Sequence, residues 1–150
     1  MNEIENIVNQ LIETYKNNLR KSSHVASGDL INNIASKIEF NNDTYQIALV
    51  MPEQWRYLEY GTRPHFPPVD AIRSWIRIKK ILPRPLKNGK LPTTNQLAYL
   101  IGRKISREGT QATHLLERSM NEIDFKKNLL DSIFEVYDMK IREALNPNQQ

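Results

Sequence analysis

The chain contains no cysteine, which excludes disulfides, thiolate metal sites and cysteine nucleophiles. Its three histidines, at positions 24, 65 and 114, lie too far apart for a zinc-type spacing. The five glycines are scattered, so they form no glycine-rich loop for a phosphate, and no serine stands in a nucleophile elbow. We therefore predict that the protein is not an enzyme and uses no metal or cofactor.

Long apolar runs are also missing. None approaches the length of a membrane span, and the first ten residues carry acids where a secretory signal needs bases. We expect no membrane contact and a location in the cytoplasm of the producing cell. With 150 residues, 39% of them hydrophobic, the chain can build one stable core, and we expect a single domain over residues 1–150.

Positive charge gathers in the middle of the chain. Residues 60–118 hold twelve Lys and Arg against three Asp and Glu, a formal charge of +9, whereas the remainder carries −5 and the whole chain +4. Such a segment attracts nucleic acid or an acidic surface on another subunit. No helix-turn-helix, zinc-finger or RNA-binding signature accompanies it, so sequence-specific reading of DNA is not expected.

Apolar residues recur at three- and four-residue steps in several stretches. They predict helices over residues 4–19, 70–80, 94–108 and 120–144. We expect Thr93 or Thr94 to cap the third of these, and Asp29 to cap a short additional helix that ends at Ile34. The predicted buried face of the last helix consists of Leu130, Ile133, Phe134, Tyr137, Ile141 and Ala144.

Near-alternation of apolar and polar residues over 34–40 and 45–51 predicts two strands, and the Asn41-Asn42-Asp43 turn between them predicts an antiparallel hairpin. Residues 53–60 fit either a short helix or a continued strand. The resulting fold class is α+β, with a small antiparallel sheet packed by N-terminal, central and long C-terminal helices.

Proline shapes the connections. Three prolines within residues 62–68 predict a stiff extended segment, after which Pro68 precedes a helix. Residues 82–92 are rich in proline and contain Asn88-Gly89, which predicts a protruding loop with a tight turn. Residues 146–150 are expected to form a frayed tail.

Two stretches are more specific than the rest: YLEYGTRPHFPPVDAIRSW at residues 57–75 and LAYLIGRKISREGT at residues 97–110. Together they resemble the small tail-component family, also called tail-completion or head–tail joining proteins, of long-tailed double-stranded DNA bacteriophages. In that family an aromatic–acid–aromatic–Gly–Thr step leads into a His–aromatic–Pro–Pro turn, a Trp-bearing helix and a helix ending in Arg-Glu-Gly-Thr. The resemblance covers most of the chain up to about Gly109.

The chain departs from the family pattern in two places. The family usually continues after Gly-Thr with a proline-containing Phe-Leu segment, whereas residues 111–116 hold no proline. The loop at residues 83–92 is also longer than a minimal connector.

The resemblance implies a non-enzymatic virion structural protein at the head–tail interface. It would form a ring of six or twelve identical subunits and contact neighbouring connector, neck and tail proteins. The terminal arms, residues 1–19 and 120–144, and the hairpin edge are the expected adhesive parts. One alternative is a tail terminator that caps the tail tube. Another, from a different class, is a cytoplasmic protein that binds DNA without sequence preference.

The motif residues expected to maintain the fold or meet a partner are Glu59, Tyr60, Gly61, Thr62, Arg63, Pro64, His65, Pro67, Pro68, Trp75, Gly109 and Thr110. Among them, Gly61 is expected to turn the chain with a positive φ, and Glu59 to form a structural ion pair with Arg63 or Arg73. The expected exposed contacts to passing double-stranded DNA or to a partner protein are Arg63, His65, Arg84, Lys87 and Lys90.

Overall fold

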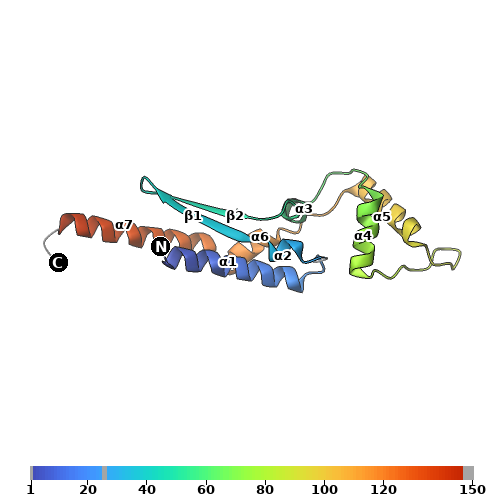
Figure 1. Cartoon of the computed structure of the whole chain (residues 1–150), viewed down its shortest axis with the longest axis horizontal. Helices are drawn as coiled ribbons and strands as arrows, with labels where there is room; N and C mark the ends of the chain where they lie inside the picture. The colour runs from blue at the N-terminus through green and yellow to red at the C-terminus, as the bar shows by residue number, and fades with distance from the viewer. Residues whose placement is uncertain (1, 25–26, 147–150) are drawn as a thin grey trace. The chain divides into compact units, whose positions relative to one another are not determined.

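The computed structural model describes residues 2–24 and 27–146, which form seven helices and one two-stranded sheet (Figure 1). In chain order the elements are α1 (Asn2–Lys21), α2 (Asp29–Asn32), β1 (Ala35–Asn41), β2 (Thr44–Val50), α3 (Gln54–Tyr60), α4 (Val69–Lys79), α5 (Thr94–Glu108), α6 (Leu115–Glu122) and α7 (Phe125–Leu145). The predicted α+β class is confirmed, and the undecided stretch before Gly61 is a helix. Within these residues, no helix has the length and apolar character needed to cross a bilayer.

The chain gathers into two compact units. Unit 1 comprises residues 1–22, 34–51 and 115–150, and unit 2 comprises residues 23–33 and 52–114. Unit 1 therefore holds α1, the β1–β2 hairpin, α6 and α7, whereas unit 2 holds α2 to α5. A single domain over the whole chain stays a prediction. Of the expected frayed tail, residues 147–150 lie outside the described residues.

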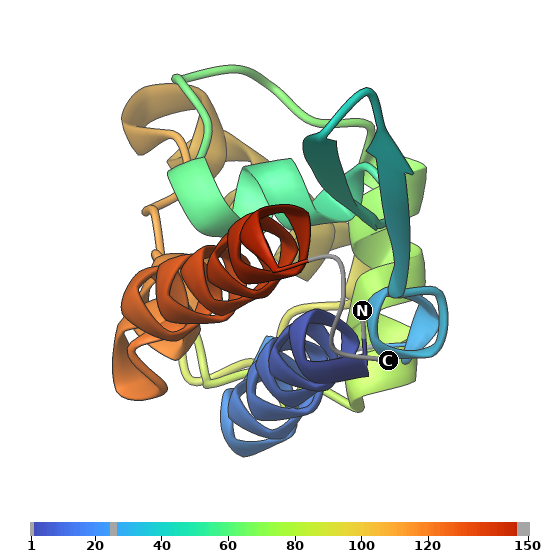
Figure 2. The same ribbon diagram turned by 90° about the vertical axis from the view of Figure 1, so that its left-hand side faces the viewer.

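The helix α1 supplies most of the core of unit 1, and it packs on α6, α7 and β1 (Figures 1 and 2). Acids in its first turn and bases in its last turn match the helix dipole. Near its end, the Asn18 side chain donates hydrogen bonds to Ser119 and Glu122 of α6, both at 2.9 Å. The buried face of α1 consists of Ile4, Val8, Leu11, Ile12, Tyr15 and Leu19.

The hairpin forms where the alternation predicts it. Its register pairs Ala35 with Val50 and Asn41 with Thr44, which leaves a two-residue turn. Both turn residues, Asn42 (φ 49°) and Asp43 (φ 58°), have left-handed backbones, as a type I′ turn requires, and Asn and Asp tolerate this conformation better than most residues.

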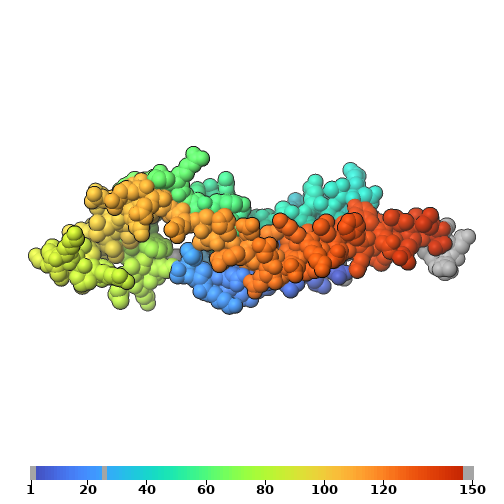
Figure 3. Space-filling view, turned by 180° about the vertical axis from the view of Figure 1, so that it is seen from behind, coloured from blue at the N-terminus to red at the C-terminus, as the bar shows by residue number. Residues whose placement is uncertain are grey.

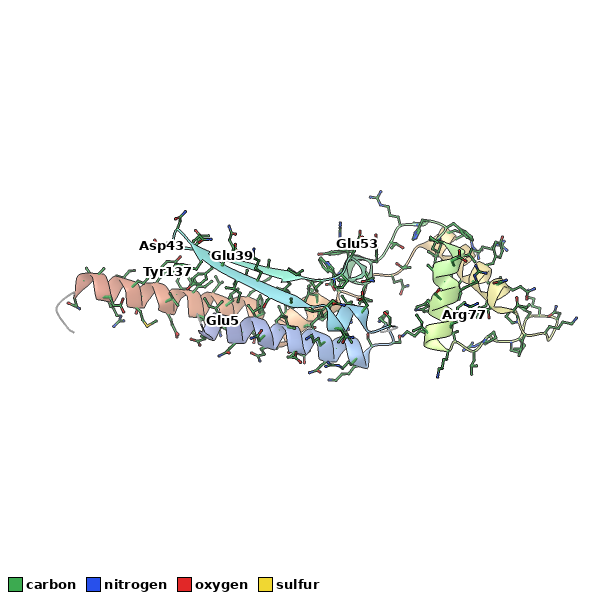
Figure 4. All side chains as sticks on the ribbon, in the orientation of Figure 1. Glu5, Glu39, Asp43, Glu53, Arg77 and Tyr137 are labelled. Carbon is green, nitrogen blue, oxygen red and sulfur yellow. The ribbon has the colours of Figure 1, made fainter. Side chains whose placement is uncertain are left out.

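The hairpin turn is fixed to α7. The Tyr137 hydroxyl donates a hydrogen bond to the Asp43 carbonyl, and Lys140 pairs with the Asp43 carboxylate at 3.1 Å (Figure 4). The same ammonium group lies 4.4 Å from the centroid of the Phe40 ring. These contacts hold the apolar face of the strands toward the helices of unit 1.

The prediction of one continuous helix over residues 120–144 is wrong. The helices α6 and α7 are separated at Asp124, whose backbone is left-handed (φ 49°). The Asp124 N–H bonds to the Asn121 carbonyl, and the Asn128 side chain donates to the Ile123 carbonyl at 2.8 Å. The Asn128 side chain thus satisfies a carbonyl that the break leaves free, so the helix is interrupted where apolar spacing alone would continue it.

The predicted buried face of the last helix is also largely wrong. Leu130, Phe134 and Ile141 are 53%, 67% and 57% exposed. The face that α7 buries instead includes Phe125 and Ser132, because the hairpin and α1 approach the helix from another side. These side chains form a row of large apolar residues on α7 that no other described part of the chain covers.

Unit 2 is built on α4 and α5, which pack against each other. Its buried core consists of Ile72, Ile76 and Ala98, with Val69, Ile81, Leu97 and Ile101 packed around it. The Trp75 side chain, on the same helix as Ile72 and Ile76, is 40% exposed. Asp29 is not a cap, because Gly28, with a left-handed backbone, holds the N-cap position of α2.

The start of α5 provides a test of local stability. The Thr93 hydroxyl accepts the Gln96 N–H at 3.2 Å, and the Gln96 side chain accepts the Thr93 N–H at 3.0 Å, which completes a capping box. We predict that Thr93→Ala lowers the free energy of unfolding by about 1 kcal/mol in urea titrations. Thr94→Ala, one residue inside the helix, is the control and should change it by less than about 0.5 kcal/mol. Equal losses in the two variants would contradict the cap.

Candidate functional site: the Gly–Thr crossing and the exposed cations

Two Gly-Thr pairs, residues 61–62 and 109–110, meet in unit 2 and form what we call the Gly–Thr crossing. Each glycine ends a helix, Gly61 after α3 and Gly109 after α5. The Thr62 N–H donates to the Thr110 carbonyl at 3.1 Å, and the Thr110 N–H donates to the Thr62 carbonyl at 3.2 Å. The two hydroxyl oxygens lie 3.0 Å apart and share a further hydrogen bond. The crossing therefore joins segments 48 residues apart.

Both glycines are required by backbone geometry and by space. Gly61 has φ 69° and ψ −171°, and Gly109 has φ 69° and ψ −158°, a region that only glycine visits readily. A Cβ atom on Gly61 would overlap the Thr110 carbonyl oxygen, and one on Gly109 would overlap the Thr62 carbonyl oxygen. The predicted positive φ at Gly61 is confirmed.

The chain beyond the crossing follows the end of α3. The Thr113 N–H and hydroxyl both donate to the Leu58 carbonyl, at 3.0 and 2.8 Å. The His114 N–H donates to the Glu59 carbonyl at 3.2 Å. These hydrogen bonds use the backbone N–H groups of Thr113 and His114, which a proline at either position would lack.

The proline-rich segment at residues 62–68 is extended and lies over α5. The His65 N–H bonds to the Ile105 carbonyl at 3.4 Å, and the Phe66 ring packs on Gly102, where a Cβ would come within 3.1 Å of it. Pro68 then holds the N-cap position of α4. The remaining prolines of the motif, Pro64 and Pro67, keep the segment extended.

The acidic residue of the motif does not form the expected ion pair. Glu59 is only 3% exposed, whereas Arg63 is exposed and has no carboxylate partner among the residues described. Arg73 pairs with Asp70 and donates to Asn95 at 3.0 Å. The prediction of a Glu59–Arg63 or Glu59–Arg73 pair is therefore wrong.

A shallow, open hollow of about 400 Å³ lies beside the crossing. It is lined by Tyr57, Thr62, Arg63, Pro64 and His65. The His65 Nδ1 lies 2.9 Å from the Arg63 carbonyl, which orients the ring. An exposed guanidinium and an exposed imidazole offer hydrogen-bond donors to a carboxylate or phosphate of a partner. Tyr60, which precedes Gly61 in the chain, is 65% exposed, and its ring meets the Trp55 ring edge-on.

The other exposed cations lie in the loop at residues 82–92. Within it, the Gly89 N–H donates to the Leu86 carbonyl and the Leu86 N–H donates to the Lys90 carbonyl, both at 2.8 Å, which fixes the predicted turn. Figure 1 shows this loop, in yellow-green, projecting beyond α4 and α5. Arg84, Lys87 and Lys90 are all exposed, as expected, and their contacts stay predictions.

The structure separates the motif residues into two groups. Gly61, Thr62, Gly109 and Thr110 come together in the crossing, where their role is to fix the backbone. Arg63 and His65 face solvent beside it. The exposure of the apolar row on α7 was not predicted from the sequence. The apolar residues at four- and seven-residue spacing were recognised, but they were assigned to the core.

Comparison of the chain with protein-family models, with curated proteins and with solved structures found no match. The resemblance to phage tail-component proteins therefore rests on the motif residues themselves.

The crossing predicts a strong and specific response to substitution. Gly61→Ala and Gly109→Ala should each lower the free energy of unfolding by about 3 kcal/mol or more, since backbone strain and overlap with a carbonyl oxygen add together. Gly89→Ala is the control, because Gly89 also has a positive φ (77°) but its Cβ would meet open space. That variant should lose about 1 kcal/mol. Thermal and urea unfolding measure all three, and similar losses at positions 61 and 89 would contradict the crossing.

Proposed function

We propose that the protein is a non-enzymatic virion subunit that assembles with copies of itself into a ring at the head–tail interface of a long-tailed phage. There it would join or complete the tail and contact the neighbouring connector and tail proteins. The motif at residues 57–75 and 97–110 suggests the family. The observation that carries self-assembly is the uncovered apolar row on α7.

This row, called here the α7 stripe, consists of Leu130, Phe134, Ile141 and Leu145. Their side chains are between 53% and 73% exposed. Steps of four, seven and four residues place all of them on one side of the helix, over a length of about 22 Å. Large apolar side chains aligned in this way mark a surface that another protein covers. Figure 3 shows α7, orange to red, running along the surface of unit 1.

The hairpin offers a second adhesive surface in the same unit. In the described residues the sheet has two strands, so both outer edges keep unpaired backbone groups. Residues of β2 that point away from the helices, such as Gln46 and Val50, are exposed. Because a two-stranded hairpin is marginal alone, and a free edge is a template for another strand, pairing with a second copy would stabilise it.

Two different surfaces on one unit suit a ring. When one surface of a subunit binds a different surface of the next subunit, the same contact repeats around an axis, and the subunits close into a ring if the rotation permits. The two faces of such a ring differ, so one could meet a head-side neighbour and the other a tail-side neighbour. The number of subunits, six or twelve, is the expectation from the resemblance. A tail terminator would form a ring of the same kind, and only the phenotype of the virus separates the two roles.

The α7 stripe gives a direct test of self-assembly. We predict that Ile141→Asp shifts the protein from an oligomer to a monomer in light scattering and native mass spectrometry, because a buried carboxylate at the interface has no partner. Met139→Asp is a matched control: Met139 is equally exposed, at 57%, but two residues away it lies about 160° around the helix. This variant should keep the parental oligomer.

Circular dichroism should show the same helix content in both α7 variants, so that loss of assembly is not loss of folding. A monomeric parent at all concentrations, or oligomers of Ile141→Asp as stable as the parent, would contradict the role of the α7 stripe.

The biological role is tested in the virus. An early stop codon in this reading frame should yield DNA-filled heads beside complete but detached tails in electron micrographs of lysates. Overlong or ragged tails would instead establish the terminator role. Normal infectious particles would overturn both roles.

A further inference from the structure

The two units carry opposite charge. Unit 2 holds twelve Lys and Arg against five Asp and Glu, a formal +7, and unit 1 holds nine against twelve, a formal −3; together they give the +4 of the chain. The α7 stripe and the open hairpin edges belong to unit 1, whereas the large apolar side chains exposed on unit 2, among them Ile78 and Leu82, are interspersed with cations. The α7 stripe and the hairpin therefore do not account for the cationic excess of unit 2.

Within unit 2 the charge is concentrated in one continuous segment. Residues 77–90 contain six Lys and Arg and no acid. We call this the cationic segment; it covers the end of α4 (Figure 4, Arg77) and the first part of the protruding loop. Its exposed members are Arg77, Lys80, Arg84, Lys87 and Lys90. The sixth, Lys79, is held by the carbonyl of Ser23.

The exposed cations are not neutralised inside the protein. Over the described ranges, none of the five lies within ion-pair distance of a carboxylate, although Arg73 pairs with Asp70 and Lys104 with Glu108 nearby in the same unit. Unpaired positive charges close together repel one another, which lowers the stability of the folded protein. A bound anion would remove this repulsion.

The chemistry of the segment favours a polyanion over a folded protein partner. Three of the five exposed cations are lysines, and lysine is depleted in protein–protein interfaces. Lysine contacts phosphate as a point charge and reads no base, and the duplex offers one negative charge about every 1.7 Å. Pro83 and Pro85 stiffen the loop, so that few conformations are lost when its cations bind.

We propose that the cationic segment of unit 2 binds the phosphate backbone of double-stranded DNA without reading its base sequence. The inference rests on the proposed function in one respect, since a ring at the head–tail interface is a place through which DNA passes. Five phosphate contacts predict a slope of about −4.5 in a plot of log affinity against log salt. Affinity should therefore fall about 500-fold between 50 and 200 mM salt, which leaves binding weak enough for DNA to slide.

The experiment measures fluorescence anisotropy of labelled 30-base-pair duplexes of several sequences with the full chain, across this range of salt. The parent should bind all duplexes alike, with the slope given above. The triple variant Arg84→Gln, Lys87→Gln, Lys90→Gln should lose about 2.7 of that slope, because three contacts are removed. The control is Lys21→Gln, Lys126→Gln, Lys127→Gln, which removes three exposed charges from unit 1 and should keep the parental slope.

The inference is overturned by any of three results. These are no DNA binding at 50 mM salt, an equal loss in the two triple variants, and a strong preference for one duplex sequence. Absent binding together with detached tails in the stop-codon virus would leave the proposed function standing and point to an acidic protein neighbour. Binding together with normal virions would overturn the proposed function and leave the DNA interaction.

Discussion

Unit 2 depends on the close approach of two Gly-Thr segments, in which each glycine lies against the threonine carbonyl of the other segment. At the Gly–Thr crossing, Gly61 and Gly109 each end a helix in a conformation that side chains forbid, and the threonines after them pair through backbone and hydroxyl groups. This fixes both ends of the segment that contains α4, α5 and the cationic loop. Because closing this segment reduces its conformational freedom, the crossing favours the core contacts among Ile72, Ile76 and Ala98 within it.

The two units differ in charge, although both expose large apolar side chains, Leu82 of unit 2 among them. Unit 1 carries the uncovered apolar row of α7 and the open edges of the hairpin, which suit association with identical copies. Unit 2 carries a net positive charge and a loop in which Arg84, Lys87 and Lys90 stay unpaired over the described residues. Apolar contacts give affinity that salt barely weakens, whereas cation–phosphate contacts are weakened strongly by salt. A ring that must stay closed while DNA moves through it would need both.

Local rules made much of this fold predictable. The turn within Asn41-Asn42-Asp43, a threonine cap at position 93 or 94 and the positive φ of Gly61 followed from what single residues can do in the backbone. The pairing of Thr62 with Thr110 could not be predicted, because no local pattern reports a contact across 48 residues. The break at Asp124 was missed for a different reason. The left-handed backbone of Asp124 and the bond from the Asn128 side chain to the Ile123 carbonyl interrupt an apolar spacing that continues past them.

The error on α7 carries information about assembly. Apolar spacing identified Leu130, Phe134 and Ile141 correctly as one helix face, and only the assumption that the same chain covers it was wrong. Hydrophobic periodicity reports that a face is apolar, not what packs on it. Where a clear apolar stripe stays exposed beside a properly buried core such as that of α1, the simplest physical account is a second protein surface. In a chain whose motif suggests a ring, we propose that this surface belongs to another copy of the same chain.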